Sequence, residues 1–500
     1  MELCYSIQTI WFLFHFIHSA SILSASAFLP LFPSSSLSSS LSSSSLSSSS
    51  ISTEDAGDVN LVDLLCTCVR AARRGCFEIR RVNSGLTRSE DGKIADKSTS
   101  ISTVDYKIAN DPRSALTAAD LAAQSAVIGL IESEWPTLKI VGEEDLSCDV
   151  ASDATGEGVC ASDLAVPSTI LVDAAQKIIK TDTVEGKAPE EVEEDREIAE
   201  LRRELITSVT SSPANTTSFT VPANDVTIFV DPLDGTREFV EGRIRNVQTL
   251  IGVSVRGMAV AGAVGLPFAV RGDTANNKSS NENDDNYSMN AAVVCGLVGA
   301  GPPRVVGERA PPTDVIHGGG VPDHGDRPLL VAGDVEDPAL VALYDSVLSF
   351  NGVNDGSGRR GRSILLGGTG QKCLAVAEGR ADVAVMNFKS SSWDTCAPEA
   401  LVRAAGGEVT DVFGEKIVHR ADPTEPATYL NACGVVVTSR EFRDLHREVC
   451  DTMRKNFHAQ KRLRVWGLSS GDIREGGNIV DESAIGDVLR DRQRRLLAGL

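Results

Sequence analysis

The amino-acid sequence predicts an α/β fold of two lobes. Three observations carry this prediction: a buried strand ends in two aspartates, apolar residues recur at helical spacing before and after that strand, and a Pro- and Gly-rich stretch divides the chain. Residues 226–230 form the strand, because their β-branched and aromatic side chains are typical of a buried strand. The strand delivers Asp231 and Asp234 at its carboxyl end, the edge where α/β proteins hold ligands.

Composition narrows the class of function. The chain has 500 residues, of which 42% are hydrophobic, so it can bury a sizeable core. Its formal charge of -21 argues against nucleic acid polymers and anionic membranes as partners, and a small anionic substrate would need a metal or local cations. The eleven cysteines contain no CxxC pair, and the seven histidines form no close cluster. Any metal is therefore expected to be carboxylate-bound, which favours magnesium.

The chain is predicted to divide into five parts. The expected limits are 1–57 for a targeting presequence with a Ser-rich segment, 58–300 for a first lobe with a polar insertion at 148–222, 301–328 for a linker loop, 329–452 for a second lobe, and 453–500 for a charged extension with helical potential from Glu482.

The first residues have the layout of a signal peptide. An apolar run at 10–17 is followed by small residues at 24–27, and a membrane anchor is the alternative interpretation. The Ser-rich tract that follows resembles the two-part plastid presequences of algae with complex plastids, although no Lys or Arg occurs before Arg70. We predict a plastid address, with the secretory pathway or the cytoplasm as alternatives, and no stable membrane span in the mature chain.

Several elements of the first lobe follow from apolar spacing. A helix is expected from residue 61, with Cys66 and Cys68 as apolar positions, and Thr117 with Asp120 three residues on indicates a second helix start. Asp120 is most simply a capping carboxylate. The strand at 140–141 ends in Gly-Glu-Glu and so repeats the layout at Asp231. Residues 190–205 are predicted to form a charged helix that faces solvent. A hairpin turn is predicted at Arg256-Gly257.

The second lobe is expected to open with a strand at 329–332 and to continue with strands at 364–366 and 381–386. The Gly367-Gly368-Thr369-Gly370 turn before a helix is a candidate phosphate cradle, and Lys372 is either an anion contact or a plain helix cation. Asp394 lies where an N-cap is expected, and its outer oxygen is a candidate ligand for a cation.

The stretch from Asp231 to Thr236 is expected to supply metal ligands and to orient the attacking water. Pro232 removes a backbone donor and fixes the turn, which leaves the Leu233 carbonyl as a neutral oxygen ligand. Gly235 permits close approach of the backbone, and the amides of a helix that begins near Thr236 would face an anion. The Thr236 hydroxyl would orient the attacking water. The plain alternative is an ordinary DPxDG turn.

Four motifs together resemble the lithium-sensitive, magnesium-dependent phosphatases that include inositol monophosphatases. They are IVGEED at 140–145, VDPLDGTREFVEG at 230–242 with NVQTLIGVSV after it, GGTGQK at 367–372, and WDTCAPE at 393–399 with AAGGEVTD after it. The resemblance spans roughly residues 59–450, and within this superfamily WDTCAPE and DGTREF favour the 3'(2'),5'-bisphosphate nucleotidases.

The resemblance implies a layered α-β-α-β-α sandwich of two lobes, with the site between them and two or three Mg²⁺ ions in it. One Mg²⁺ would bind Glu143, Asp231 and the Leu233 carbonyl, and a second, about 4 Å away, would bind Asp231, Asp234 and Asp394. Asp120 and Thr236 would be catalytic and deprotonate the water. The implied substrate contacts are Gly235, Thr236, Gly368, Thr369, Lys372 and Asp394.

The implied reaction is removal of the 3'-phosphate of adenosine 3',5'-bisphosphate to give AMP, with 3'-phosphoadenylyl sulfate as a second candidate substrate and a monomer or weak dimer as the working state. One departure concerns specificity: the nucleotide-contacting Thr-Arg-Ser-His stretch of such nucleotidases is replaced by Val331-Ala332-Gly333-Asp334-Val335. A phosphatase for an inositol bisphosphate or another sugar phosphate, and a non-catalytic metal or nucleotide sensor, therefore stay open as alternatives.

Overall fold

The structure is a computed structural model, and it describes residues 57–84, 86–88, 94–96, 105–106, 115–144, 189–211, 219–269, 291–309, 316–317, 328–332, 363–386, 390–420, 430–431, 433–455, 474–475 and 478–479. The predicted targeting segment, the stretch 333–335 and the predicted helix from Glu482 lie outside these residues. Both lobes belong to one compact unit, Asp55–Leu500.

Two six-stranded sheets organise this unit. The first has the order β12-β11-β10-β9-β8-β6, in which β6 is parallel to β8 and all other pairs are antiparallel. Its strands are β6 (Lys139–Gly142), β8 (Val226–Asp234), β9 (Gln248–Val255), β10 (Met258–Leu266), β11 (Ala292–Leu297) and β12 (Arg304–Val306).

The second sheet has the order β13-β15-β14-β16-β20-β18, and only the pairs of β14 with β15 and β16 are parallel. Its strands are β13 (Ile316–His317), β14 (Leu330–Ala332), β15 (Ser363–Leu365), β16 (Val383–Met386), β18 (Glu408–Thr410) and β20 (Val435–Thr438). The strands expected at 329–332, 364–366 and 381–386 are confirmed within one or two residues.

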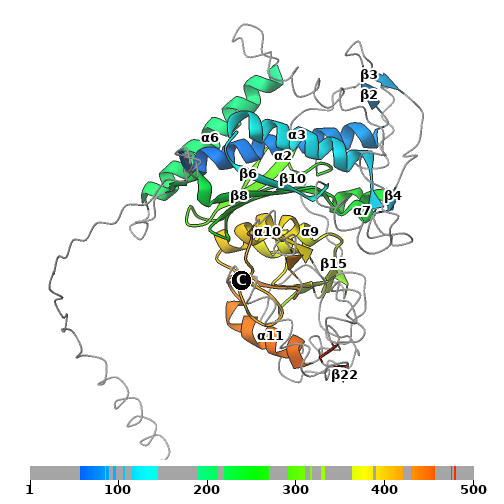
Figure 1. The fold of residues 1–500 in the computed structure, drawn as a ribbon, viewed down its shortest axis with the longest axis vertical. Helices are drawn as coiled ribbons and strands as arrows, with labels where there is room; N and C mark the ends of the chain where they lie inside the picture. Colours follow the sequence, from blue (N-terminus) through cyan, green and yellow to red (C-terminus); the bar gives the residue numbers. More distant parts are fainter. Residues whose placement is uncertain are drawn as a thin grey trace, which may run out of the picture. The chain divides into compact units, whose positions relative to one another are not determined.

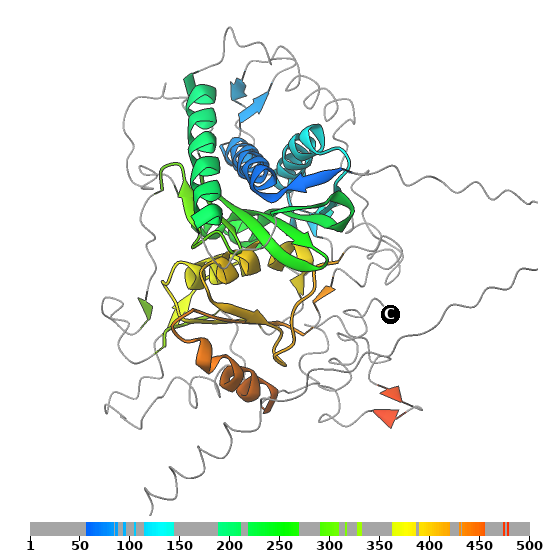
Figure 2. The ribbon, with the colours of Figure 1, turned by 90° about the vertical axis from the view of Figure 1, so that its left-hand side faces the viewer.

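Helices form three layers around the two sheets (Figure 1). On one side of the first sheet lie α2 (Leu61–Asn83), α3 (Ala118–Glu134) and α6 (Pro189–Ser211), and between the sheets lie α9 (Thr369–Ala377) and α10 (Ser392–Ala404). Beyond the second sheet lies α11 (His446–Lys455). Figure 2 shows the yellow helices α9 and α10 enclosed by the two sheets. The predicted layered α-β-α-β-α sandwich is confirmed.

Short elements complete the described chain. They are the helices α7 (Thr236–Val240), η4 (Ala223–Asp225), η5 (Ile244–Asn246) and η7 (Arg443–Leu445), and the paired strands β1 (Asp58–Asn60) with β7 (Thr220–Pro222), β2 (Leu86–Arg88) with β3 (Ile94–Asp96), β4 (Asp105–Tyr106) with β5 (Ala115–Leu116), β17 (Ser390–Ser391) with β19 (Leu430–Asn431), and β21 (Arg474–Glu475) with β22 (Asn478–Ile479). Among the described residues, no helix has both the length and the apolar character that a membrane crossing requires.

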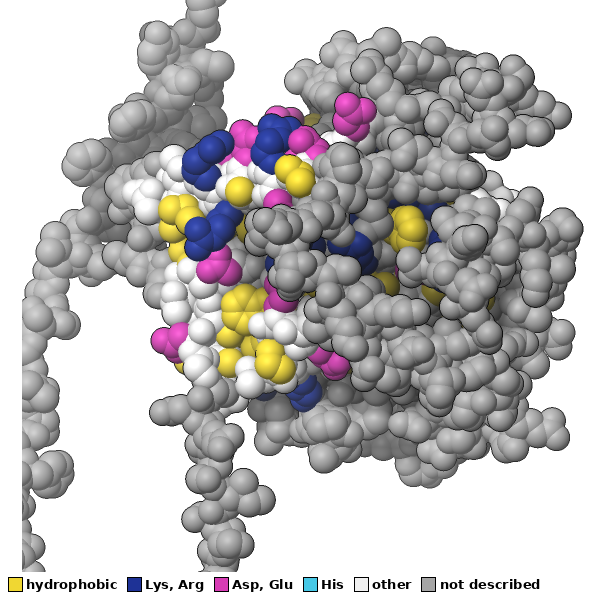
Figure 3. Space-filling view, turned by 90° about the horizontal axis from the view of Figure 1, so that it is seen from above, with side chains coloured by type: hydrophobic (Ala, Val, Ile, Leu, Met, Phe, Trp, Pro, Cys, Tyr) yellow, Lys and Arg dark blue, Asp and Glu magenta, His cyan; other side chains and the backbone are white. Residues whose placement is uncertain are grey.

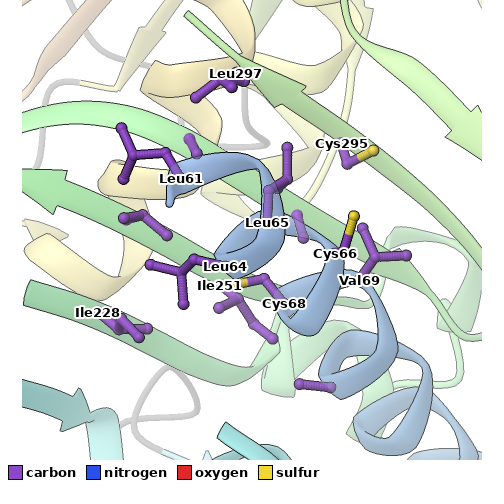
Figure 4. Close-up of a cluster of buried hydrophobic side chains, with 14 of the residues drawn as sticks. Leu61, Leu64, Leu65, Cys66, Cys68, Val69, Ile228, Ile251, Cys295 and Leu297 are labelled. Atoms are coloured by element: carbon purple, nitrogen blue, oxygen red, sulfur yellow. The ribbon is translucent and has the colours of Figure 1, made fainter. Parts of the chain in front are cut away.

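Helix α2 supplies the main core of the first lobe. The Asn60 side chain caps it by accepting hydrogen bonds from the amides of Val62 and Asp63. Its apolar face packs on the first sheet, and Figure 4 shows Leu64 and Leu65 among side chains of β8, β9 and β11. The expectation that Cys66 and Cys68 are apolar positions is confirmed, because both are buried, and burial raises the pKa of Cys66 to about 11.

Helix α6 differs from its prediction on one face. Its outer face carries exposed ion pairs such as Arg196 with Glu193, and Figure 3 shows basic and acidic side chains interspersed on this side of the described chain. The inner face is not solvated, because Leu201 and Leu205 are buried in the core and Glu197 binds the fully buried Arg73. The predicted solvated helix is therefore an amphipathic one that covers α2.

The connection between the lobes also differs from its prediction. Residues 301–328 were expected to form a linker loop, but they contain β12 at the edge of the first sheet and β13 at the edge of the second. The predicted hairpin at Arg256-Gly257 is present between β9 and β10, with positive φ values of 52° and 82°.

Candidate active site

Strand β8 brings Asp231 and Asp234 into the interior through an irregular turn. The register against β9 shifts between the two aspartates, so that Asp231 faces Leu250 and Asp234 faces Gln248. Both carboxylates are buried, and the amide of Leu233 donates to Asp231 Oδ1 at 3.0 Å. Gly235 then adopts φ 90°, which a side chain would disfavour, and α7 begins at Thr236 as expected. We call residues 231–236 the acidic loop.

Asp120 meets this loop from α3. Thr117 and Asp120 form a reciprocal capping box, in which Asp120 Oδ2 accepts from the Thr117 amide at 2.8 Å and from the Thr117 hydroxyl at 2.6 Å. The Thr236 hydroxyl lies 3.1 Å from Asp120 Oδ1 and 3.1 Å from the Leu233 carbonyl oxygen. Asp120 is thus both the predicted capping carboxylate and a neighbour of a residue 116 positions away.

Glu143 arrives on the neighbouring strand. Gly142 at the end of β6 pairs with Val230 on β8 in parallel register, so Glu143 and Asp231 leave the sheet at the same edge. The strand before Glu143 is thus confirmed, and its position beside β8 agrees with what the family resemblance implies.

Asp394 approaches from the second lobe. It is the third residue of α10 and not its N-cap as expected, because Ser391 takes that place. The Ser391 amide donates to Asp394 Oδ2 at 2.6 Å in a second capping box.

These acids act on one another electrostatically. The pKa of Asp231 lies well above its usual range because the carboxyl is buried and because Glu143, Asp234, Asp394 and Asp120 add negative charge around it. The five acids that the sequence singled out therefore share one electrostatic field, although they come from four separate stretches of the chain.

The first turn of α9 meets Asp234 directly. The amides of Thr369 and Gly370 donate to its two carboxylate oxygens at 3.1 and 2.8 Å. Burial raises the pKa of Asp234 to about 6, while Lys372 and these two amides oppose that rise. The turn expected to cradle a phosphate therefore holds a carboxylate here.

The glycine and lysine of this turn have defined places. A Cβ at Gly368 would lie 2.6 Å from Asp234 Oδ2, and the residue has φ 70°, so the close approach requires glycine. Lys372 is buried, its ammonium donates to the Gly368 carbonyl oxygen at 2.8 Å, and its charge acts on Asp234.

The donor set fits a hard divalent cation. Carboxylate oxygens with one backbone carbonyl are the ligands that Mg²⁺ prefers, and a divalent cation would offset the negative charge that surrounds the buried Asp231. As they stand in the described part of the chain, no three His, Cys, Asp or Glu side chains are close enough together to hold an ion. Asp120, Asp231, Asp234 and Asp394 each accept a hydrogen bond from a backbone amide.

Two residues at the start of β9 were missed in the sequence. Gln248 and Thr249 are fully buried beside the acidic loop, and the Thr249 hydroxyl donates to the Pro232 carbonyl oxygen at 2.9 Å. The Gln248 amide donates to Gln371 Oε1 of α9 at 2.9 Å and so joins the lobes. The available signal was the pair of polar residues that opens an otherwise apolar strand.

Comparison with known proteins agrees with the resemblance seen in the motifs. The model of the inositol monophosphatase family matches residues 165–317 and 327–456, which together make up more than half of the chain. The 3'(2'),5'-bisphosphate nucleotidase 1 of Dictyostelium discoideum is 27% identical over 80% of this chain and 98% of its own, and the human protein of that name is 23% identical over 65% and 79%.

The Golgi-resident adenosine 3',5'-bisphosphate 3'-phosphatase of Rattus norvegicus is 24% identical over 73% of this chain and 75% of its own. Among solved structures, the extragenic suppressor protein suhB from Bartonella henselae covers 79% of this chain and 100% of its own at 15% identity and a TM-score of 0.41. The family model matches the acidic loop, the α9 turn and Asp394 in one chain. This chain therefore belongs to the inositol monophosphatase family.

Proposed function

We propose that this chain is a Mg²⁺-dependent phosphomonoesterase that removes the 3'-phosphate of adenosine 3',5'-bisphosphate and releases AMP and phosphate. The observation that carries the proposal is the buried Asp231, whose pKa four other acids raise. Such a cluster is costly without a cation and suited to one. The names of the nucleotidase relatives support the choice of substrate.

The acids divide between two ion positions. Glu143, Asp231 and the Leu233 carbonyl would hold one Mg²⁺, and Asp231, Asp234 and Asp394 would hold a second. When bound, the Mg²⁺ ions supply Lewis-acid stabilisation of phosphoryl charge and lower the pKa of a water. Asp231 is the shared ligand, which agrees with its central place in the electrostatic field of the acids.

Thr236 and Asp120 are the catalytic residues of this proposal. The Thr236 hydroxyl lies within hydrogen-bond distance of Asp120 Oδ1, so it can donate its proton there and accept one from the attacking water. Asp120 keeps a fixed orientation because the amide and hydroxyl of Thr117 occupy its other oxygen. A buried carboxylate aimed in this way would take up the proton of the water.

The second lobe would bind the phosphate. The buried Lys372 acts on Asp234, so a phosphate beside that carboxylate would be within reach of its positive charge. The amides of Thr369 and Gly370, which donate to Asp234 here, would turn to the phosphate when a cation binds that carboxylate. Gly235 and Gly368 would contact the substrate through backbone atoms, and Thr369 and Asp394 would contact its polar groups.

A phosphate-release assay tests the proposal. Purified protein is supplied with adenosine 3',5'-bisphosphate or inositol 1,4-bisphosphate, each with Mg²⁺, with Mg²⁺ and excess chelator, and with Mg²⁺ and millimolar lithium. We expect release from the nucleotide only with Mg²⁺ and inhibition by lithium. Preference for the inositol phosphate would overturn the substrate, and release that survives chelation would overturn the metal requirement. No release from either substrate would favour a sensor.

The relatives also bear on location. Several are Golgi-resident phosphatases, and the first residues of this chain have the layout of a signal peptide. We propose entry into the secretory pathway, with the plastid as the further destination that the Ser-rich tract favours. A fluorescent protein fused behind residues 1–57 tests this, and cytoplasmic fluorescence would contradict it.

A further inference from the structure

The Thr249 hydroxyl bonds to the turn that carries the proposed metal ligands. The register of β8 against β9 shifts between Asp231 and Asp234, and Thr249 is the residue of β9 between their two partners. Its hydroxyl donates to the Pro232 carbonyl oxygen at 2.9 Å. Pro232 itself has no amide hydrogen, so this turn has fewer backbone bonds to hold it than a regular strand pair would have.

The Thr249 side chain has little freedom to move. It is fully buried, and it faces α2, where a Cβ at Gly75 would lie 3.1 Å from its Cγ2 atom. The thiol of Cys76 lies 4.0 Å from its hydroxyl oxygen on the same side. The α2 layer therefore fixes the rotamer that points the hydroxyl at Pro232.

The Pro232 carbonyl lies between the atoms proposed to bind metal. Asp231 precedes it, and the Leu233 carbonyl and Asp234 follow it. A rotation of this peptide would move the Leu233 amide, which donates to Asp231 Oδ1 at 3.0 Å, and would thereby shift the Asp231 carboxylate. We propose that Thr249 is a positioning residue, whose hydroxyl sets the geometry of the acidic loop for divalent metal binding. This inference rests on the proposed metal site.

Two substitutions at position 249 separate the hydroxyl from the volume of the side chain. Thr249→Val keeps the branched shape and removes the donor, whereas Thr249→Ser keeps the donor and loses one methyl group. The matched control is Thr410→Val on β18, where another buried threonine hydroxyl donates to a backbone carbonyl, that of Asp411, at 2.7 Å. Thr410 lies outside the catalytic and binding machinery.

The readout is Mn²⁺ binding to each folded protein, measured by calorimetry without substrate and well below its melting temperature. We expect Thr249→Val to raise the dissociation constant about tenfold, the equivalent of one buried hydrogen bond. Thr249→Ser should stay within about twofold of wild type because the bond is retained. Thr410→Val should melt earlier and bind Mn²⁺ like wild type.

The outcomes distinguish the two proposals. Equal Mn²⁺ affinity in wild type and Thr249→Val would overturn the role of Thr249 and leave the metal site intact. An equal loss of affinity in Thr249→Val and Thr410→Val would also overturn it, because the effect would then follow stability alone. A wild-type protein that binds no Mn²⁺ would overturn the proposed metal site and this inference with it.

Discussion

The two lobes contribute different groups to the site: the first mainly acids, and the second mainly hydrogen-bond donors and a positive charge. The first lobe carries four of the five acids, on α3, after β6 and at the end of β8. The second lobe brings Asp394 together with two amide donors and the buried Lys372. Asp234 is tolerated in the interior because donors from the other lobe meet both of its oxygens. Packing of the lobes is therefore part of the site and not merely its frame.

The same local motif serves different purposes in the two lobes. Asp120 and Asp394 are each the third residue of a helix in a capping box. Asp120 also accepts the Thr236 hydroxyl, which ties it to the acidic loop of its own lobe. Asp394 adds its charge to Asp231 across the lobe boundary. We therefore expect Asp120 to accept the proton of the attacking water and Asp394 to bind a metal ion.

The largest effect is expected at Asp234, the residue of the first lobe that accepts hydrogen bonds from the second lobe. Asp234→Asn should lower turnover by more than about a thousandfold, because a neutral ligand weakens the metal and the attacking water together. The matched control is Asp225→Asn in η4, which pairs with the exposed Arg256 and should stay near wild-type activity. Steady-state phosphate release measures both variants, and retained activity in pure Asp234→Asn would contradict its assignment as a ligand.

The second prediction separates the two capping acids. Asp120→Asn should lower kcat about a hundredfold with little change in Mg²⁺ affinity, because it removes a proton acceptor. Asp394→Asn should instead raise the Mg²⁺ concentration for half-maximal activity about tenfold or more. Activity against Mg²⁺ concentration gives both constants. If activity depended on Mg²⁺ concentration in the same way in both variants, the proposed separate roles of Asp120 and Asp394 would be contradicted.

The third prediction concerns pH in the metal-free protein. The pKa of Asp234 is about 6 in the folded chain against an ordinary 3.8, so the folded state binds more protons than the unfolded state between these values. Stability without metal should therefore fall as pH rises from about 4 to about 6, with Asp231 acting in the same direction.

Melting temperatures in chelator at pH 5 and pH 7 test this sign. The protein should melt at a higher temperature at pH 5, by up to about 2 °C for each kcal/mol by which protonation of the buried acids stabilises a chain of this size. Added Mg²⁺ should restore stability at pH 7, and Asp231→Asn should flatten the pH dependence. A melting temperature in chelator that rises between pH 5 and pH 7 would be the wrong sign for a buried cluster of like charges.

The smallest effect is expected at the glutamines between the lobes. Gln371 accepts from the Gln248 amide at 2.9 Å and donates to the Arg245 carbonyl oxygen at 3.1 Å. Gln371→Met should raise the Michaelis constant about fivefold, since each such bond contributes on the order of 1 kcal/mol. Gln248→Met and the double variant with both substitutions complete a double-mutant cycle. Additive effects would mean that the two glutamines do not act as a pair.

Local patterns in the sequence predicted much of this arrangement. The apolar run before Asp231 indicated β8, Thr117 and Asp120 indicated a capped helix, and the apolar residues before Glu143 indicated β6. Each of these depends on neighbours along the chain. The Thr236 contact with Asp120 depends on how α3 packs on β8, and spacing along the sequence contains no measure of that distance.

Two predictions left out a partner that is distant in the sequence. The α9 turn is a candidate phosphate cradle by its sequence, and its amides donate to Asp234 of the other lobe. The α6 charges were interpreted as solvated, but Glu197 of that helix meets the buried Arg73 of α2. In both cases the partner of a polar group lies far away in sequence. A segment considered alone is therefore easily interpreted as exposed to solvent or as a ligand-binding turn, although its polar groups have partners in another part of the fold.

Acids from both lobes are proposed to hold shared metal ions, and the number of Mn²⁺ ions bound by each variant tests this proposal. Calorimetric titration of wild type, Asp394→Asn and Asp231→Asn counts the ions that each protein binds. We expect at least two ions for wild type, the loss of one in Asp394→Asn, and the loss of both in Asp231→Asn, because Asp231 is the shared ligand. Full stoichiometry in Asp231→Asn, or no bound Mn²⁺ in wild type, would contradict it.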